Sequence, residues 1–144
     1  MTPLPIRLLL HVAGWLLFLI GVTILLDPHA VFASNGIPLS TNPDLLSEIR
    51  APGGLLTAAA IVMVRGALRH DGAHPALLVG MIVYGSYGVA RVVAMALDGP
   101  PATPLIAVTV LELVVAILCA AARTRLPSRQ SGRPATADVP ASRV

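Results

Sequence analysis

The sequence predicts an all-α protein: a four-helix transmembrane bundle, antiparallel and up-down-up-down, with both termini on the cytoplasmic side. Of its 144 residues, 56% are hydrophobic and only 12% are charged, whereas about a quarter of the residues of a soluble domain carry a charge. Four apolar blocks approach the roughly 20 residues that a helix needs to cross a bilayer. None of them alternates as a barrel strand does, which indicates helices.

The first predicted span covers residues 8–26 and ends before Asp27-Pro28. A second interpretation is a signal peptide, in which Arg7 precedes the apolar run and "VFA", ending at Ala33, is a small-residue cleavage site. The run is longer than the usual apolar region of a signal peptide, and Asp27-Pro28 comes before the cut. We therefore favour a retained helix; cleavage would leave three spans.

The other predicted spans each begin at a proline and cover residues 52–68, 75–97 and 104–122. Proline suits the first turn of a helix, where its missing N–H is not needed. In the long connection before the second span, Asn42-Pro43-Asp44 is typical of a helix cap, a first-turn proline and an acidic first turn. It predicts a short helix that Pro52 interrupts, because proline removes a backbone hydrogen bond.

The arginines predict the orientation, because basic residues collect on the cytoplasmic side of membrane proteins. With the N-terminus inside, eight arginines fall on that side: Arg7, Arg65, Arg69, Arg123, Arg125, Arg129, Arg133 and Arg143. The opposite side receives a single arginine, Arg50. The N-in, C-in arrangement follows from this asymmetry.

The chain divides into a four-helix transmembrane domain, residues 1–122, and a tail, residues 123–144. The tail is rich in Arg, Ser, Pro and Ala, a composition that favours disorder. Arginines near an anionic leaflet contribute about 1 kcal/mol each. We therefore expect a disordered cytoplasmic tail whose partner is the anionic lipid of the inner leaflet.

Arg91 lies inside the third span and needs a partner. At 1.5 Å per residue, it lies about 10 Å below Asp98 at the outer end of its helix, and Glu112 lies about 12 Å below Pro104. The connection between these two helices is short, so they are antiparallel neighbours and the two charges have similar depths. An unpaired arginine at the centre of a span costs about 2.5–3.5 kcal/mol. We predict an Arg91–Glu112 ion pair inside the bundle.

Polar side chains gather on the face of the third span that carries Arg91. At about 100° per residue, this face also holds both tyrosines and the aspartate at the outer end of the span. The acidic and basic residues before the second span are expected to reach the same place. The predicted ligand-binding cleft opens to the extracytoplasmic side and is lined by Arg91, Glu112, Glu48, Arg50, Tyr84, Tyr87 and Asp98.

Small residues predict where helices approach closely. Gly53 and Gly54 have this role in the second span, and Ser86, Ala90 and Ala94 form a small-residue edge on the third. The fourth span is expected to turn one face inward, formed by Thr109, Glu112, Ala116 and Cys119.

Several function classes lack their signature. Aromatic residues make up 3% of the chain and no basic stripe accompanies them, so a nucleic-acid partner is not expected. His70 and His74 have metal-like spacing, but Gly72 and Pro75 disfavour a helix there and no third ligand is near, so no metal site is expected. No motif identifies a cofactor or catalytic residues, which leaves both unknown.

Three functions fit these features. The first is a binding or accessory protein that holds a small anionic or amphiphilic ligand. The second is a membrane enzyme or redox-complex subunit acting on a lipid or quinone, with Glu112 as a proton carrier. The third is a structural partner that assembles through its small-residue faces, for example as a homo-oligomer. In the third case Arg91 and Glu112 only lock the helices together.

Three strings carry a family resemblance: "SEIRAPGG", "YGVARVVAMALDGPP" and "LELVVAIL". They resemble the domain-of-unknown-function 4345 family of small four-helix bacterial membrane proteins, over residues 8–122. The matching positions are Glu48, Arg50, Gly53, Gly54, Ala90, Arg91, Asp98, Gly99, Pro101, Leu111 and Glu112. The resemblance implies a four-helix fold and a multi-pass place in the inner (plasma) membrane, and it implies no activity.

Overall fold

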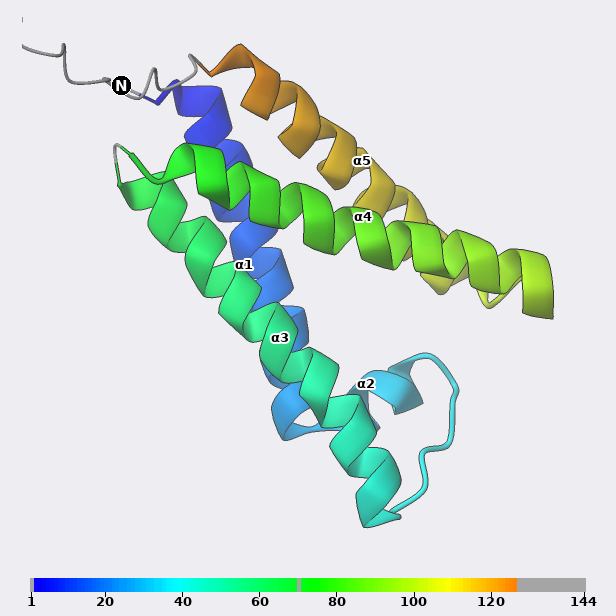
Figure 1. Ribbon diagram of the computed structural model, residues 1–144. Helices are drawn as coiled ribbons and strands as arrows, with labels where there is room; N and C mark the ends of the chain where they lie inside the picture. The colour runs from blue at the N-terminus through cyan, green and yellow to red at the C-terminus, as the bar shows by residue number, and fades with distance from the viewer. Residues whose placement is uncertain (1, 70, 127–144) are drawn as a thin grey trace, which may run out of the picture.

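A computed structural model describes residues 2–69 and 71–126. In this part the chain forms five helices: α1 (Leu4–Leu26), α2 (Pro28–Ser34), α3 (Pro43–Leu68), α4 (Ala73–Asp98) and α5 (Thr103–Arg125) (Figure 1). All of them except the short α2 are long and apolar enough to cross a membrane. The predicted all-α class and four-helix bundle are confirmed.

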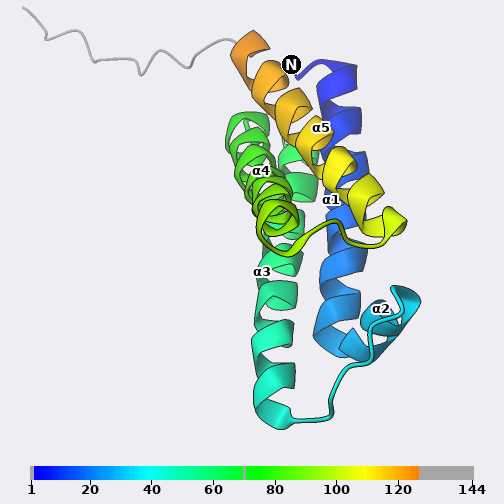
Figure 2. The same ribbon diagram turned by 90° about the vertical axis from the view of Figure 1, so that its right-hand side faces the viewer.

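The four long helices form two antiparallel pairs. α1 packs along α3, and α4 packs along α5 (Figures 1 and 2). The pairs meet mainly through α3 and α4, near the end that holds the N-terminus, and Figure 1 shows that they diverge toward the other end. This divergence decides which side chains share a cavity.

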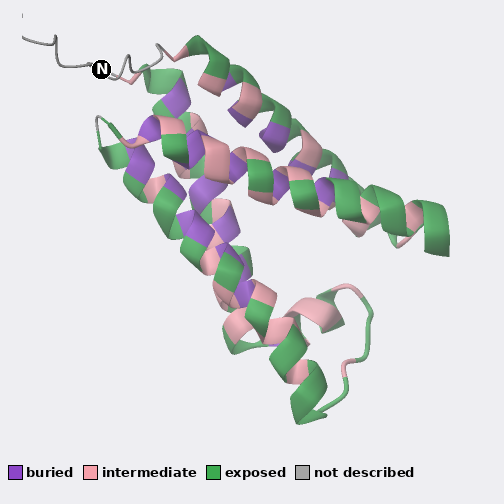
Figure 3. Ribbon diagram, in the orientation of Figure 1, coloured by how far each residue is buried: buried purple, intermediate pink, exposed green. Residues whose placement is uncertain are grey.

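Burial follows the inward faces of the helices (Figure 3). The fully buried side chains include Leu10 of α1, Met63 of α3, Leu77 of α4 and Cys119 of α5. Large apolar side chains such as Leu19 and Ile117 are exposed on the outer faces. A soluble monomer rarely exposes continuous apolar surface, so this surface fits a lipid environment.

Five arginines of the described chain lie in the terminal turns of α1, α3 and α5 that meet at one end of the bundle (Figure 2): Arg7, Arg65, Arg69, Arg123 and Arg125. One of them also bridges two helices. The Nε of Arg7 donates a hydrogen bond of 3.1 Å to the carbonyl oxygen of Ala67, in the last turn of α3. The predicted charge asymmetry therefore corresponds to one end of the folded bundle.

The connection between the first two spans differs from the prediction. The cap is confirmed, since the side chain of Asn42 accepts hydrogen bonds from the backbone N–H groups of Asp44 and Leu45. The helix that starts there, however, continues through Pro52 to Leu68 as one element. Proline removes one backbone hydrogen bond from an interior turn. The helix of twenty-six residues continues in spite of this missing bond.

Two further boundaries also change. α2 was not predicted, although Asp27-Pro28 repeats the cap and first-turn proline of Asn42-Pro43; it starts at Pro28, and the side chain of Asp27 caps it by accepting from the N–H of Ala30 at 3.1 Å. α5 continues to Arg125, so the predicted disordered tail is helical over its first residues. Residues 127–144 of that tail lie outside the described residues.

Of the two glycines predicted to pack against another helix, Gly53 lies in the contact between α1 and α3 and Gly54 does not. A Cβ on Gly53 would lie 2.8 Å from the backbone nitrogen of Leu25 and 3.0 Å from the carbonyl oxygen of Gly21, so α1 and α3 touch backbone to backbone there. A Cβ on Gly54 would have no neighbour within 4 Å. The prediction is confirmed for Gly53 and wrong for Gly54.

Among the described residues, no helix of this chain packs on the predicted small-residue edge of the third span, since Ser86, Ala90 and Ala94 are all exposed. The buried small residues of α4 are Ala73, Ala76, Gly80 and Gly88, and the two glycines lie on a different side of the helix from the predicted edge. A Cβ on Gly88 would come within 2.7 Å of Leu113, and one on Gly80 within 3.0 Å of the sulfur of Cys119. α4 therefore packs closely on α5 at both glycines, and at Gly80 also on α3, where a Cβ would lie 2.9 Å from Cε of Met63.

Candidate functional site

The predicted ion pair is present where α4 and α5 face each other. The Nε of Arg91 lies 3.1 Å from Oε2 of Glu112 and donates a hydrogen bond of 3.4 Å to Oε1. The Glu112 side chain is 11% exposed and that of Arg91 is 34% exposed. The guanidinium therefore reaches open space from a carboxylate that is held in the bundle.

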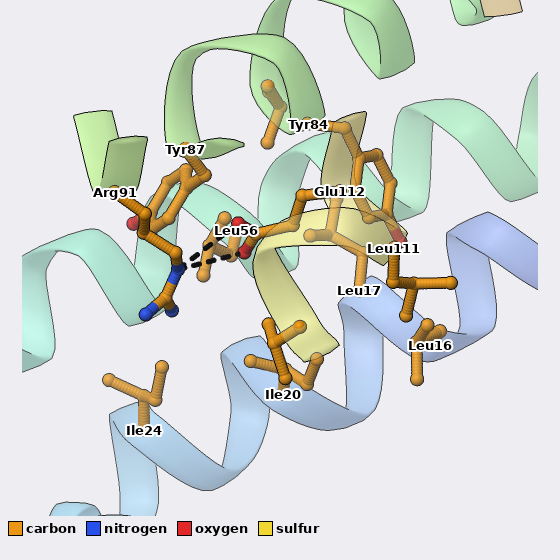
Figure 4. A pocket seen from close by; sticks show the side chains of 12 residues that line it. Leu16, Leu17, Ile20, Ile24, Leu56, Tyr84, Tyr87, Arg91, Leu111 and Glu112 are labelled. Carbon is orange, nitrogen blue, oxygen red and sulfur yellow. Dashed lines mark hydrogen bonds and ion pairs between the residues drawn. The ribbon is translucent and has the colours of Figure 1, made fainter. Parts of the chain in front are cut away.

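Both partners leave hydrogen-bonding capacity unused among the described residues. Arg91 engages Glu112 through Nε, and its two terminal nitrogens point away from the carboxylate (Figure 4). The Oε2 of Glu112 is buried and accepts no hydrogen bond, although Nε is close. Five N–H donors are available on an arginine, so most of the guanidinium is free to bind another group.

An apolar cavity of about 70 Å³ begins at this pair, between the two pairs of helices. Its walls come from four helices, with α1 and α5 supplying most of the aliphatic side chains (Figure 4). The lining residues are Leu16, Leu17, Ile20, Ile24, Leu56, Val83, Tyr84, Tyr87, Arg91, Val108, Leu111 and Glu112. The polar groups of this apolar cavity belong to the ion pair and the two tyrosines.

A second space, which we call the outer pocket, lies on the other side of Arg91 toward the end of α4. Its volume is about 180 Å³, and it is lined by Arg91, Ala94, Met95, Asp98, Gly99, Pro101, Leu105 and Thr109. Arg91 lines both spaces. An apolar cavity and a pocket that carries the two charged groups Arg91 and Asp98 thus meet at one guanidinium.

Tyr84 joins α4 to α1 beside the apolar cavity. Its hydroxyl donates a buried hydrogen bond of 2.7 Å to the carbonyl oxygen of Ala13, so this side chain fixes the wall of the cavity. Tyr87, one turn closer to Arg91, makes no hydrogen bond through its hydroxyl within the described chain. The two tyrosines therefore differ: one is anchored and one is available.

Tyr84→Phe is expected to lower the stability of the bundle by about 0.6 kcal/mol and by no more than about 1.7 kcal/mol, the range measured for hydrogen bonds between membrane helices. Thermal unfolding in detergent measures this effect, with Tyr87→Phe as the matched control. Equal midpoints for both variants would show that the bond to Ala13 contributes nothing.

Two residues of the predicted cleft lie elsewhere. An Nη of Arg50 donates to the carbonyl oxygens of Leu25 and Leu26, where it caps the C-terminal end of α1. Glu48 is exposed and lines neither the apolar cavity nor the outer pocket. The prediction that they reach the cleft is wrong, because α4 and α5 diverge from the end of α3 that carries them.

The remaining predicted residues are brought together. Tyr84, Tyr87, Arg91 and Glu112 line the apolar cavity, and Asp98 lines the outer pocket. The sequence missed the wall that α1 provides, with Leu16, Ile20 and Ile24. Aliphatic residues on a spanning helix look alike whether they face lipid or a cavity, so periodicity carried no signal for them.

The inward face of the fourth span is confirmed, since Thr109, Glu112, Ala116 and Cys119 are all buried. Cys119 is a free thiol in the core. Within residues 2–69 and 71–126, no group of three His, Cys, Asp or Glu side chains is placed to hold a metal ion. His70 lies outside the described residues.

Comparison with known proteins gives one match. The family described as "Domain of unknown function (DUF4345)" matches residues 5–122, which include all of α2, α3 and α4, α1 except its first residue, and α5 except its last three residues. No curated protein and no solved structure matches the chain.

Proposed function

We propose that this chain, which belongs to the DUF4345 family, binds an amphiphile within the membrane. The part of the ligand's apolar chain nearest its head group occupies the apolar cavity, the rest of the chain lies in the surrounding lipid, and an anionic, hydrogen-bond-accepting group binds the free nitrogens of Arg91. The observation that carries this proposal is the position of Arg91, which lines both spaces and uses only its Nε for Glu112.

The chemistry of the guanidinium supports an anionic group. Arginine is always charged and presents its donors in a planar fork that matches carboxylate and phosphate. Glu112 holds one edge of this fork and fixes its orientation in advance, which reduces the entropy lost on binding. A purely structural ion pair is most stable when both sides of the guanidinium bind carboxylate oxygens. Here only Nε does so, and the terminal nitrogens face open space.

The charges at the two ends support a place in the inner membrane. We assign the end with Arg7, Arg65 and Arg69 to the cytoplasm, because basic residues are retained on that side. The outer pocket then opens toward the extracytoplasmic face. The ligand enters from the outer half of the bilayer, between the diverging pairs of helices.

The test is mass spectrometry of small molecules that remain on the protein after purification in a mild detergent. The wild type is expected to retain an amphiphile, and Arg91→Gln/Glu112→Gln to retain at least tenfold less, because hydrogen bonds to a charged group contribute about 1.5–3 kcal/mol. The double variant has no unpaired buried charge, so its fold is preserved. Arg65→Gln, on the opposite end, is the control.

Two results would overturn the proposal. One is a wild-type protein from which no amphiphile can be extracted. The other is a double variant that retains as much ligand as Arg65→Gln does.

Glu112 supports a second candidate, proton transfer to a bound lipid or quinone. Its Oε2 is buried and free of hydrogen bonds among the described residues, so it can exchange a proton with a ligand in the apolar cavity. Turnover of the bound molecule distinguishes the two functions: it is absent in the first, and in the second Glu112→Gln lowers turnover further than it lowers the amount of ligand bound.

A further inference from the structure

The outer pocket has a positive floor and a negative rim. Arg91 forms the floor, and Asp98, the last residue of α4, forms the rim. Seven residues separate them, which places their backbones about 10 Å apart along the helix axis at 1.5 Å per residue. The pocket therefore presents two opposite charges in a fixed order, with the positive one nearer the apolar cavity.

The negative charge of the rim is greater than that of one carboxylate. A helix carries about half a negative charge at its C-terminal end, and its last carbonyl groups lack partners inside the helix. Gly99, at φ +93°, ends the helix at this point, and its N–H satisfies the carbonyl of Met95. A carboxylate at this end is repelled by the helix dipole, and within the described chain no cation pairs with Asp98.

The charges of the site disfavour a purely anionic head group. Arg91 contributes one positive charge, while Glu112 and Asp98 each contribute a negative one. An anion bound to Arg91 meets two carboxylates and the negative end of α4. A ligand that adds its own cation at the rim removes this repulsion and supplies Asp98 with the partner that it lacks.

We infer that the ligand carries a zwitterionic head group of the phosphoethanolamine type: a phosphate next to the apolar chain and a primary ammonium beyond it. This inference rests on the proposed function and specifies its ligand. The order of groups matches the order of the site, with the start of the chain in the apolar cavity, the phosphate on Arg91 and the ammonium on Asp98.

The lining of the outer pocket favours a primary ammonium over a quaternary one. A primary ammonium donates three hydrogen bonds, and the rim supplies the carboxylate of Asp98 to accept from it. A quaternary ammonium donates none and is recognised by aromatic rings. No aromatic side chain lines the outer pocket.

Native mass spectrometry of the detergent-purified full chain tests the inference. Dioctanoyl phosphatidylethanolamine, phosphatidylcholine and phosphatidylglycerol are added at equal concentrations, and the bound fraction of each is measured. The wild type is expected to prefer the ethanolamine lipid about tenfold over both others. In Asp98→Asn the preference over phosphatidylglycerol is expected to fall close to one, whereas Asp44→Asn, which removes an exposed carboxylate at the outer end of α3, leaves it unchanged.

Water-soluble phosphoethanolamine identifies which source of this head group the site takes. Competition by the soluble compound at millimolar concentration indicates that the head group alone is sufficient. Failure to compete, with the lipid preference intact, indicates that the acyl chain in the apolar cavity is required. Both results support a zwitterionic site and differ only in the ligand that fills it.

The failures of the two proposals are distinguishable. If Asp98→Asn binds all three lipids in wild-type proportions while Arg91→Gln/Glu112→Gln binds none of them, the zwitterionic assignment is wrong and amphiphile binding stands. If the double variant also binds all three as the wild type does, the proposed function is wrong as well.

Discussion

Removing the charge of Arg91 alone is expected to destabilise the protein more than removing both charges of the pair. Arg91→Leu leaves the carboxylate of Glu112 buried without a counter-charge. Breaking a buried ion pair in this way costs about 3–5 kcal/mol, whereas replacing both partners by apolar residues is often neutral. Because the Arg91 side chain is 34% exposed, we expect a loss near 3 kcal/mol, the lower end of that range.

Thermal unfolding in detergent of four proteins measures this effect: wild type, Arg91→Leu, Glu112→Leu and the double variant. The expected pattern is a low midpoint for Arg91→Leu and a midpoint close to wild type for the double variant. Three variants that all unfold at the wild-type midpoint would mean that the pair contributes nothing to stability.

Charge reversal separates the structural role of the pair from its binding role. Arg91→Glu combined with Glu112→Arg restores an ion pair between α4 and α5, so the midpoint is expected to return toward wild type. The guanidinium then projects from α5, and the retained amphiphile is expected to stay at least tenfold below wild type. If ligand retention returns together with stability, the position of Arg91 between the two spaces has no functional meaning.

The ion pair could be predicted because its geometry depends on local quantities. Helical rise fixes the depth of Arg91 and of Glu112, and the short connection between α4 and α5 makes the two helices neighbours. Helical periodicity places Tyr84, Tyr87 and Arg91 on one face. Each of these arguments concerns one helix or one hairpin, and each holds in the structure.

The predictions for Glu48 and Arg50 failed because they required the angle between two hairpins. The two residues lie in the first turns of α3, at the opposite end from Arg65, as predicted, but α4 and α5 diverge there from α3 (Figure 1). The side chain of Arg50 instead binds the carbonyls at the end of α1. Periodicity says which face of a helix is polar and does not say how far the next helix lies from it.

The small residues of α4 show the same limit of prediction from one helix at a time. α4 carries two candidate packing edges, one with Ser86 and Ala90 and one with Gly80 and Gly88, on nearly opposite sides. Ser86 and Ala90 fit a small-xxx-small motif, whereas Tyr84 lies between the two glycines, and yet α3 and α5 pack against the glycines. Leu113 packs beside Gly88 because of the way α5 lies against α4. This tertiary contact cannot be predicted from the sequence of α4 alone.

Gly53→Ala is expected to destabilise the bundle, and Gly54→Ala is expected to leave it unchanged or slightly more stable. The new Cβ at position 53 would lie 2.8 Å from the backbone nitrogen of Leu25, and backbone cannot rotate away as a side chain can. α1 and α3 must separate, and overpacking of this kind costs about 1–3 kcal/mol. At position 54 the Cβ meets open space, and replacing glycine by alanine inside a helix gains about 0.5–1 kcal/mol.

Thermal unfolding of the two alanine variants compares identical chemical changes at adjacent positions, so their difference isolates the contact between α1 and α3. Gly21→Ala is the reciprocal change, since its Cβ would lie 2.7 Å from the backbone nitrogen of Thr57, and it is expected to match Gly53→Ala. Separation of α1 from α3 also moves Ile24 and Leu56, two walls of the apolar cavity. Gly53→Ala is therefore expected to retain less amphiphile than Gly54→Ala, and equal stability and equal retention in the two variants would exclude the backbone contact.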